Sequence, residues 1–190
     1  GLTFLHVTHD QEEAMDMADT VAVMNKGRIE QMGAPEKLYD RPHTVFVSKF
    51  LGQSNLFVGE VAESNANSIS INVSGNKITV PTDRAEKHTG TIAVGVRPEK
   101  ANFHETEPSA QAGINLIGPG EIIDIRFTGV SNQYLIEIPG IGNVTVFAQN
   151  VGKSPVTELG ANVWVSWKVE HSFGLSDLPQ NSATESISVI

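Results

Sequence analysis

The sequence contains no cysteine, no long apolar run and few basic residues. Without cysteine the chain has neither a disulfide framework nor a thiolate metal site, which fits a reducing compartment. No apolar stretch approaches the ~20 residues of a membrane-spanning helix, and the amino-terminal residues lack the pattern of a signal peptide. The net charge is −9, from 22 acidic and 13 basic residues. A nucleic-acid-binding face, which is normally basic, is therefore not expected.

The local sequence pattern of the 190-residue chain changes near residue 52. This length suffices for one large or two small domains. Residues 1–52 carry 8 acidic and 5 basic side chains, and residues 53–190 carry 14 and 8, so the acidic excess is spread over both parts. We predict one domain over residues 1–52, a second over residues 53–176, and a polar tail over residues 177–190.

The first part is predicted to consist of short strands and helices. The apolar run over residues 3–8 predicts a buried strand. Because the chain starts directly on this strand, we expect it to be a piece of a longer protein. A helix is predicted over residues 11–19, with an apolar stripe of Ala14, Met15 and Ala18. The next predicted elements are a hairpin over residues 21–32, which turns at Gly27, and short helices over residues 35–39 and 44–51.

His9 lies between the predicted strand and the predicted helix. In open α/β sheets, ligands lie at the carboxyl ends of strands. Asp10 is placed to accept a hydrogen bond from the first helical turn, and Glu13 completes a capping-box pattern. Since this cap fixes where the helix begins, it also fixes where His9 points. The alternative is a surface histidine at a helix start without a function.

From residue 53 onward, short β-rich runs alternate with Gly, Asn, Ser and Pro. Period-two alternation at residues 69–73 and 134–138 is typical of strands, and residues 134–138 and 143–147 are predicted to form a hairpin. Such regular short strands favour a small barrel or sandwich. Strands are predicted over residues 55–62, 68–73, 76–81, 91–97, 120–128, 133–138, 144–148 and 162–169.

The stretch THDQEEAMDMADTVAVMNKGRIEQMGAPEKLYDRP, which begins at Thr8, resembles the carboxyl-terminal part of an ABC transporter ATPase subunit of the importer kind. In that family the histidine of the T-H-D motif is the switch histidine, which contacts the γ-phosphate of ATP. The resemblance assigns this role to His9. An imidazole suits it, because it can donate to a phosphate oxygen or to the attacking water.

The β-rich part resembles the TOBE domain, an OB-like barrel that follows the ATPase core of such importers. Gly95-Val96-Arg97-Pro98-Glu99 is similar to its R-P-E signature, and residues 160–167 resemble its closing strand. The expected fold is therefore an α+β fragment, the end of a P-loop ATPase domain with strand, helix, hairpin and short helices, followed by an all-β OB-like TOBE barrel.

The resemblance implies that the full-length parent is an ABC-type transport ATPase that uses ATP and Mg²⁺. It implies a cytoplasmic subunit, peripheral on the inner face of the membrane, that dimerises and docks on permease subunits. The residues resemble the spermidine/putrescine importers most, while importers of ferric iron, sulfate or sugar have similar subunits. The phosphate-binding loop G-x-x-x-x-G-K-[S/T] is absent from these residues. We therefore expect this chain to be inactive alone, with no cofactor and no metal site.

Arg97 and Glu99 flank Pro98 and are the regulatory candidates of the β-rich part. Our first interpretation is an ion pair that fixes the end of a strand, which contributes ~0–1 kcal/mol when exposed. The second is a contact for dimerisation or for an effector. His43, His88, His104 and His171 show no metal-ligand spacing and are predicted to be surface residues.

Two further expectations concern partners. The β-rich part is alternatively a binding module that senses a small ligand or a regulatory protein. Binding of single-stranded nucleic acid by an OB-like surface needs a basic groove with stacked aromatics, which this composition does not favour. Strand edges left unpaired in residues 1–52 recruit partners, so the chain is predicted to dimerise.

Overall fold

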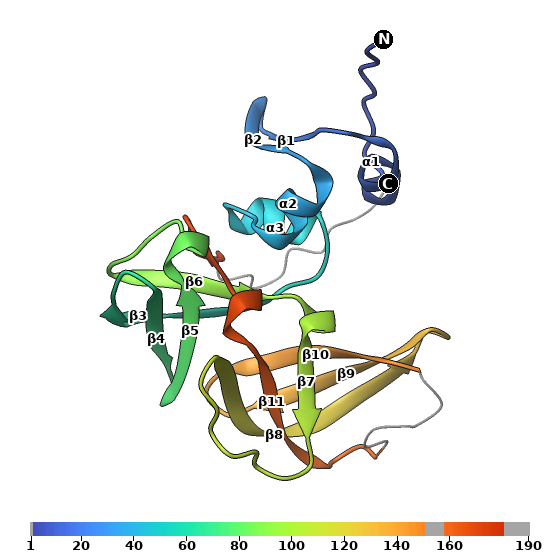
Figure 1. Cartoon of the computed structure of the whole chain (residues 1–190). Coiled ribbons are helices and arrows are strands. Elements are labelled where there is room, and N and C mark those ends of the chain that lie inside the picture. Colours follow the sequence, from blue (N-terminus) through green and yellow to red (C-terminus); the bar gives the residue numbers. More distant parts are fainter. Residues whose placement is uncertain (1, 151–157, 181–190) are drawn as a thin grey trace.

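The chain has a small helical part and a larger β-rich part, which Figure 1 shows one above the other. This computed structural model describes residues 2–150 and 158–180. The helical part contains α1 (Gln11–Met17), the hairpin β1 (Val21–Asn25) and β2 (Arg28–Gly33), α2 (Pro35–Asp40) and α3 (Val45–Phe50). Lys26 and Gly27 form the hairpin turn with φ values of 48° and 77°. Two such positive values are what a tight two-residue hairpin turn requires.

The helical part has a small core of its own. Val21 and Val23 of the hairpin pack with Leu38 of α2 and with Val47 and Leu51 in and after α3. The predicted apolar stripe of α1, formed by Ala14, Met15 and Ala18, packs against this cluster. The hairpin and the three helices therefore lie where the sequence predicted them, within a few residues.

The strand predicted over residues 3–8 is not formed. These residues belong to no sheet, and the side chains of Phe4, Leu5 and Val7 are at least 84% exposed. A strand needs a neighbour to satisfy its N–H and C=O groups, and no strand of the described residues lies beside this segment. The prediction of a buried strand is therefore wrong for this chain.

The β-rich part consists of two five-stranded antiparallel sheets around one core. The first sheet has the order β12-β6-β3-β4-β5, and the second has the order β10-β9-β8-β11-β7. The first comprises β3 (Asn55–Ser64), β4 (Ser68–Val73), β5 (Asn76–Pro81), β6 (Thr91–Val96) and β12 (Phe173–Leu175). The second comprises β7 (Ala101–His104), β8 (Ile114–Phe127), β9 (Ser131–Ile138), β10 (Gly142–Gln149) and β11 (Asn162–Lys168). Three short 3₁₀ turns, η1 (Thr82–Arg84), η2 (Pro98–Lys100) and η3 (Val169–His171), connect strands.

The two sheets are copies of one strand pattern. Residues 55–104 contribute β3 to β7 and residues 114–175 contribute β8 to β12, and corresponding strands pair with corresponding partners. The register agrees where the first strands begin, since Asn55 lies opposite Val96 and Asn115 lies opposite Trp167, whereas a bulge between Val163 and Val165 shifts the rest of the second pair. The two first strands even share letters, N-L-F-V-G-E-V in β3 and N-L-I-G-P-G-E-I in β8. The β-rich part is thus an internal duplication, which the sequence analysis missed.

Each half gives its last strand to the other half's sheet. β7 follows η2 and pairs with β11, while β12 follows η3 and pairs with β6. Two asparagine side chains make hydrogen bonds between the two sheets. The Asn55 side chain donates to the Thr145 carbonyl and accepts from its N–H, both at 2.8 Å, and Asn115 does the same with Thr79. These amides extend one sheet to the edge strand of the other and tie the halves together.

Most predicted strands are found, with two additions. β7 and β12 were not predicted, and β8 begins at Ile114 rather than at residue 120. Trp167 is buried and stacks on Phe57 at 5.3 Å, whereas Trp164 lies on the opposite face of β11 and is partly exposed. The predicted class, short helices and a hairpin followed by an all-β part, is confirmed.

Candidate functional site at the joint between the two parts

His9 is exposed, directly before α1. Asp10 caps this helix through a hydrogen bond from the Glu13 N–H to its Oδ1 at 3.1 Å, as predicted. The reciprocal half of the capping box is not formed, because the Asp10 N–H donates to the Thr8 hydroxyl at 3.0 Å. In the described part of the chain, His9 has no hydrogen-bond partner. Its position is thus fixed by the cap, but nothing holds its ring.

Glu13 reaches back along the chain instead of to Asp10. Its carboxylate lies 3.3 Å from the Nε2 atom of His6. Hydrogen bonding to Thr8, and then to His6, lowers the pKa of Glu13. This contact orders the residues on either side of His9.

Arg97 is buried and follows the last residue of β6, from where it donates hydrogen bonds to the helical part. Its Nε and Nη2 donate to the Tyr39 carbonyl at 3.2 and 2.9 Å, and its Nη1 donates to the Ser48 carbonyl at 2.7 Å. Nη1 also reaches the Gln53 carbonyl at 3.0 Å and the Ser54 hydroxyl at 2.8 Å. The guanidinium lies 4.0 Å over the ring of Tyr39. One side chain therefore holds α2, α3 and the connection to β3.

The predicted ion pair between Arg97 and Glu99 is not formed. Arg97 donates to backbone carbonyls in the last turns of α2 and α3, which carry the partial negative charge of helix carboxyl ends. Burial lowers the pKa of Arg97, but a guanidinium stays protonated in proteins. This interaction could not be predicted from the sequence neighbours of Arg97, because all its partners lie more than forty residues earlier in the chain.

Glu99 binds the helical part as well. Its Oε1 accepts a hydrogen bond from the Tyr39 hydroxyl at 2.8 Å. Burial and this contact with Glu99 raise the pKa of Tyr39 to about 12. Both regulatory candidates, Arg97 and Glu99, thus hold the same tyrosine from opposite ends, through its carbonyl and through its hydroxyl.

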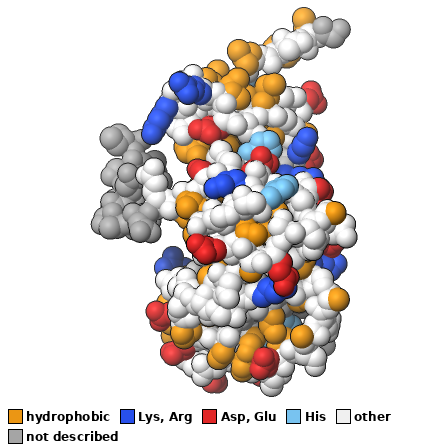
Figure 2. All heavy atoms as spheres, turned by 90° about the vertical axis from the view of Figure 1, so that its left-hand side faces the viewer, with side chains coloured by type: hydrophobic (Ala, Val, Ile, Leu, Met, Phe, Trp, Pro, Cys, Tyr) orange, Lys and Arg blue, Asp and Glu red, His pale blue; other side chains and the backbone are white. Residues whose placement is uncertain are grey.

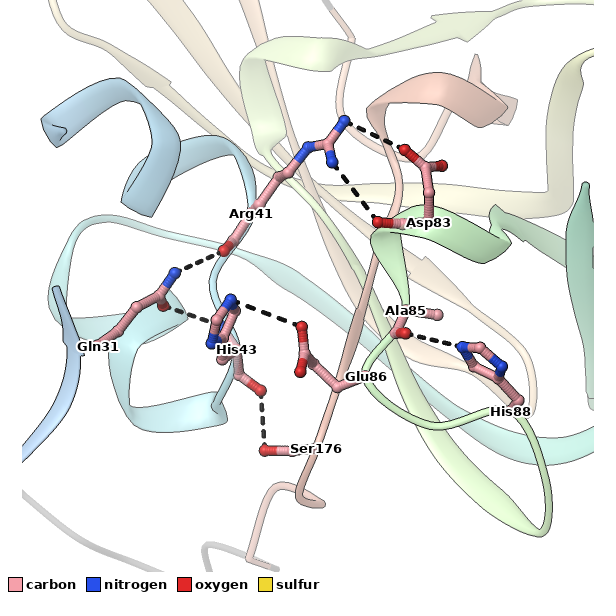
Figure 3. A network of polar contacts seen from close by, with 8 residues as sticks. All are labelled: Gln31, Arg41, His43, Asp83, Ala85, Glu86, His88 and Ser176. Carbon is pink, nitrogen blue, oxygen red and sulfur yellow. Dashed lines mark hydrogen bonds and ion pairs between the residues drawn. The ribbon is translucent and has the colours of Figure 1, made fainter. Parts of the chain in front are cut away.

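A second set of polar contacts joins the two parts on another side (Figure 3). Arg41 lies 3.4 Å from the Asp83 carboxylate, and His43 lies 3.6 Å from that of Glu86. Gln31 of β2 supports this loop by donating to the Arg41 carbonyl at 2.9 Å and accepting from the His43 N–H at 3.0 Å. The loop between α2 and α3 is therefore held from both sides.

The carboxyl-terminal end of the described chain adds to these contacts between the helical part and the β-rich part, which together we call the joint. Ser176 donates to the His43 carbonyl through its N–H at 2.8 Å and through its hydroxyl at 2.9 Å. Asp177, the first residue of the predicted tail, accepts from the Val45 N–H at 2.7 Å and so caps α3. Arg84 donates to the Asp40 carbonyl at 2.6 Å and to the Ser172 carbonyl at 2.9 Å.

The joint connects segments of the β-rich part to α2 and α3. Arg97, Glu99, Arg84 and Asp177 come from three separate segments of the β-rich part, and together they fix the end of α2 and both ends of α3. In residues 2–150 and 158–180, no group of His, Asp and Glu side chains is arranged to hold a metal ion. No described helix is long and apolar enough to cross a membrane.

The histidines predicted as surface residues have mixed environments. His88 is exposed and contacts the Ala85 carbonyl at 3.0 Å, whereas His104 is partly buried and hydrogen-bonded to the Ser166 hydroxyl at 2.7 Å. His171 is also partly buried, and its Nδ1 is enclosed without a partner in the described part of the chain. His43 belongs to the joint.

Comparison with known proteins agrees with both parts of the fold. The TOBE domain family matches residues 94–175. The chain is 35% identical over 176 residues, 92% of its length, to the spermidine/putrescine import ATP-binding protein PotA of Thermobifida fusca. It is 38% identical over 169 residues, 86% of its length, to the PotA protein of Trichormus variabilis. The chain spans about half the length of these curated relatives, 45% and 43%.

A solved structure shares the fold of the β-rich part. The cytoplasmic molybdate-binding protein ModG superposes with a TM-score of 0.52 over 63% of this chain and 94% of its own. Its sequence identity is only 15%, so the likeness concerns the fold alone. The expected OB-like TOBE architecture is confirmed by this likeness together with the match of the domain family.

Proposed function

We propose that this chain belongs with the TOBE-containing ATP-binding proteins of ABC importers and that it supplies the switch-histidine segment and the TOBE domain of such a subunit. The observation that carries the proposal is identity above 30% to such proteins over most of the chain, across both the helical and the β-rich part. The imported substrate that this similarity favours is a polyamine, spermidine or putrescine. Ferric iron, sulfate and sugar remain the alternatives.

In this proposal His9 contacts the γ-phosphate of ATP in the parent enzyme. Phosphoryl transfer needs positioning and charge stabilisation more than covalent chemistry, and an imidazole donor provides both. The Asp10 cap and the Glu13–His6 contact hold the backbone on either side of His9. The ring itself is exposed and free to meet a phosphate that other residues hold.

The residues present do not form a nucleotide site by themselves. The sequence has no phosphate-binding loop, and His9 is the one side chain of the chain assigned to ATP by resemblance. ATP and Mg²⁺ therefore belong to the parent enzyme in this proposal. There the subunit works in the cytoplasm, peripheral to the membrane, as a homodimer docked on permease subunits.

The joint gives the TOBE domain a rigid connection to the ATPase part. The Arg97 hydrogen bonds and the Asp177 cap connect α2 and α3 to the β-rich part, so a displacement of either helix during the ATP cycle would be transmitted to it. Regulation through the TOBE domain would use the same connection in the opposite direction.

The role of His9 is tested in a longer protein that joins this chain to the rest of an ATP-binding domain. We expect His9→Ala to lower kcat for ATP hydrolysis by ~10²- to 10³-fold, the usual effect of removing one transition-state donor. His88→Ala is the matched control, because it removes an exposed histidine of the β-rich part that makes no contact with the segment around His9, and it should leave the rate unchanged. Equal rates for His9→Ala and the unaltered protein would refute the assignment.

ATP binding by the chain alone is tested separately from the identity of the imported substrate. Calorimetric titration of this chain with ATP and Mg²⁺ should give no binding heat, and micromolar affinity would contradict the proposal.

Uptake of labelled spermidine by cells that depend on the longer protein should fall when that protein is removed. Uptake of sulfate or ferric iron falling instead would point to one of the alternative importers.

A binding module that senses a ligand or a regulatory protein is the second candidate. The observation in its favour is that the β-rich part has a core and two five-stranded sheets of its own. If the chain is a polyamine sensor, spermidine or putrescine should raise its melting temperature, and no change would count against this candidate.

A further inference from the structure

The outer face of the second sheet, which points away from the core, differs from the equivalent face of the first sheet. The second sheet lies at the end of the molecule away from the helices (Figure 1). The two halves share a bulge at the same place, after Val61 in β3 and after Ile122 in β8. From this bulge the strand registers show which residues of the two faces correspond.

Three positions of this face carry larger apolar side chains in the second half. The corresponding residues are Ala62 and Ile123, Ser70 and Leu135, and Pro81 and Phe147. Ile123 is 40% exposed, and Leu135 and Phe147 are partly exposed. Because they come from the three neighbouring strands β8, β9 and β10, they form one apolar row across the sheet.

The charges of the face also change from the first half to the second. In the first half the Lys77 ammonium lies 2.6 Å from the Glu63 carboxylate. In the second half Asn143 takes the place of Lys77, and Glu137 takes the place of Asn72. The second face has therefore lost a cation and gained a carboxylate.

Glu121 of β8 and Glu137 of β9 lie directly opposite each other, and both are exposed. Like charges in opposite positions of neighbouring strands destabilise a sheet. Among residues 2–150 and 158–180, neither of these two carboxylates makes an ion pair. The nearby cation of Arg126 is paired with Asp124 at 2.8 Å. A cationic partner would relieve the repulsion between the two glutamates.

We propose that this face binds a basic amphipathic helix of another protein. Its apolar side chains would cover the row of Ile123, Leu135 and Phe147, and its Lys or Arg side chains would lie beside Glu121 and Glu137. A second copy of this chain fits less well, because its net charge of −9 brings carboxylates to carboxylates. The surface does not depend on the proposed ATPase role.

A helix that crosses the strands matches the spacing of the apolar row. Neighbouring strands lie ~4.8 Å apart, and side chains on one face of a helix recur about every 5.4 Å. Apolar residues three or four positions apart on the helix would therefore meet β8, β9 and β10 in turn. This is the usual mode by which an amphipathic helix binds an apolar surface.

The first experiment uses a fluorescent amphipathic peptide of Leu and Lys, about 14 residues or roughly four helical turns long. Its anisotropy is measured against increasing concentrations of this chain. We expect binding that weakens as salt is added, and no binding of the same peptide with Glu in place of Lys. Absence of binding by the Lys peptide, or equal affinity for both peptides, would overturn the proposal.

Variants of the carboxylates show whether this face attracts the peptide. The double variant Glu121→Gln, Glu137→Gln should weaken binding about tenfold, roughly threefold for each charge. Glu60→Gln, Glu63→Gln is the matched control, because it removes the two carboxylates of the equivalent face, and it should leave the affinity unchanged. Equal losses in the two double variants would show attraction to any acidic surface and would refute the site.

Variants of the apolar row test its share of the binding. Leu135→Ser should weaken binding about tenfold, the scale of burying one large apolar side chain. Ile123→Ser is more exposed and should act in the same direction, so a folding defect of one variant does not decide the test. Phe4→Ser is the control at the exposed amino-terminal end and should leave the affinity unchanged. Full affinity in both variants of the row, or a loss in Phe4→Ser, would place the peptide elsewhere and contradict the proposal.

Discussion

Arg97 is a buried cation that neutralises no carboxylate. Its Nε, Nη1 and Nη2 groups donate to carbonyl and hydroxyl oxygens, and the fixed planar shape of the guanidinium lets one side chain serve four acceptors in three segments. An ammonium could not do this from a single nitrogen. Arginine is therefore required here for its geometry as much as for its charge.

Replacing Arg97 should destabilise the joint before it affects the sheets. Arg97→Met removes the guanidinium donors from the carbonyls of Tyr39, Ser48 and Gln53, and we expect a loss of about 3 kcal/mol in the free energy of unfolding. Lys168→Met is the matched control, because Lys168 is the equivalent residue of the second half and is exposed, so its change should stay within about 0.5 kcal/mol.

Urea unfolding measures both variants, and hydrogen exchange locates the effect. In Arg97→Met the amides of α2 and α3 should exchange faster than those of β8 and β9. Uniform loss of protection across both parts would show that Arg97 stabilises the β-rich core rather than the joint.

Tyr39 makes the joint sensitive to alkali. Its pKa is raised to about 12 in the folded chain, against about 10 for the unfolded chain. Between these values the unfolded chain binds fewer protons than the folded one, so the stability contributed by the neutral phenol is complete below pH 10 and is lost as the pH rises toward 12. Tyr39→Phe should be less stable at neutral pH but should lose less stability between pH 10 and 12. Chemical denaturation across this range measures it, and parallel curves for both proteins would contradict it.

At the scale of the element, α3 shows how a short helix is kept in place. Six residues are too few for an isolated helix to be stable in water. Thr44 accepts from the Val47 N–H at 3.2 Å, Asp177 accepts from the Val45 N–H, and Arg97 binds the Ser48 carbonyl near the other end. Both ends of α3 are therefore satisfied, in part by residues far along the chain.

Asp177 should matter although the sequence places it in a polar tail. Asp177→Ala removes one acceptor from the first turn of α3 and should cost about 1 kcal/mol, the usual value of such a cap. Asp177→Asn keeps an acceptor and should recover most of that loss. Thermal unfolding compares the three proteins, and an unchanged melting temperature for Asp177→Ala would show that Thr44 alone is sufficient.

Local sequence patterns predicted the elements whose backbone hydrogen bonds are made with residues nearby in the sequence. The hairpin over residues 21–32 and the strands β4 and β5 follow from turn residues and alternation, so they were found with nearly correct bounds. The strands β7 and β12 have four and three residues and pair only with the other half, so no local signal marks them. The segment over residues 3–8 has the pattern of a strand, but it has no neighbour among the described residues.

At the scale of the whole molecule, duplication explains the placement of residues that sequence analysis treated separately. Asn55 and Asn115 lie at equivalent positions near the starts of β3 and β8, and each binds the edge strand of the other sheet. Arg97 and Lys168 occupy equivalent positions, but only Arg97 meets helices. The two halves have diverged: one binds the helical part, and the other leaves the equivalent position exposed. Strand pairings between the halves cannot be predicted from residues that are neighbours in the sequence.

The amino-terminal end carries an apolar surface that should make the chain self-associate. Hydrophobic side chains gather at that end of the molecule (Figure 2). Burying four large ones at about 1.5–3 kcal/mol each gives 6–12 kcal/mol, and association itself costs ~4–15 kcal/mol, so a weak dimer is expected. The residues are Leu2, Phe4, Leu5 and Val7, each at least 84% exposed, and Met24, Ile29 and Met32 on the hairpin are exposed as well.

Sedimentation over a wide range of concentration tests this association. The average mass of the unaltered chain should rise with concentration, whereas the double variant Phe4→Ser, Leu5→Ser should remain a monomer with an unchanged melting temperature, because both side chains are exposed. Val58→Ser is the matched control, since it removes an exposed apolar side chain from the β-rich part and should still associate. If the double variant associates as strongly as the unaltered chain, the contact lies elsewhere, and the β-rich part would be the surface that brings two copies together.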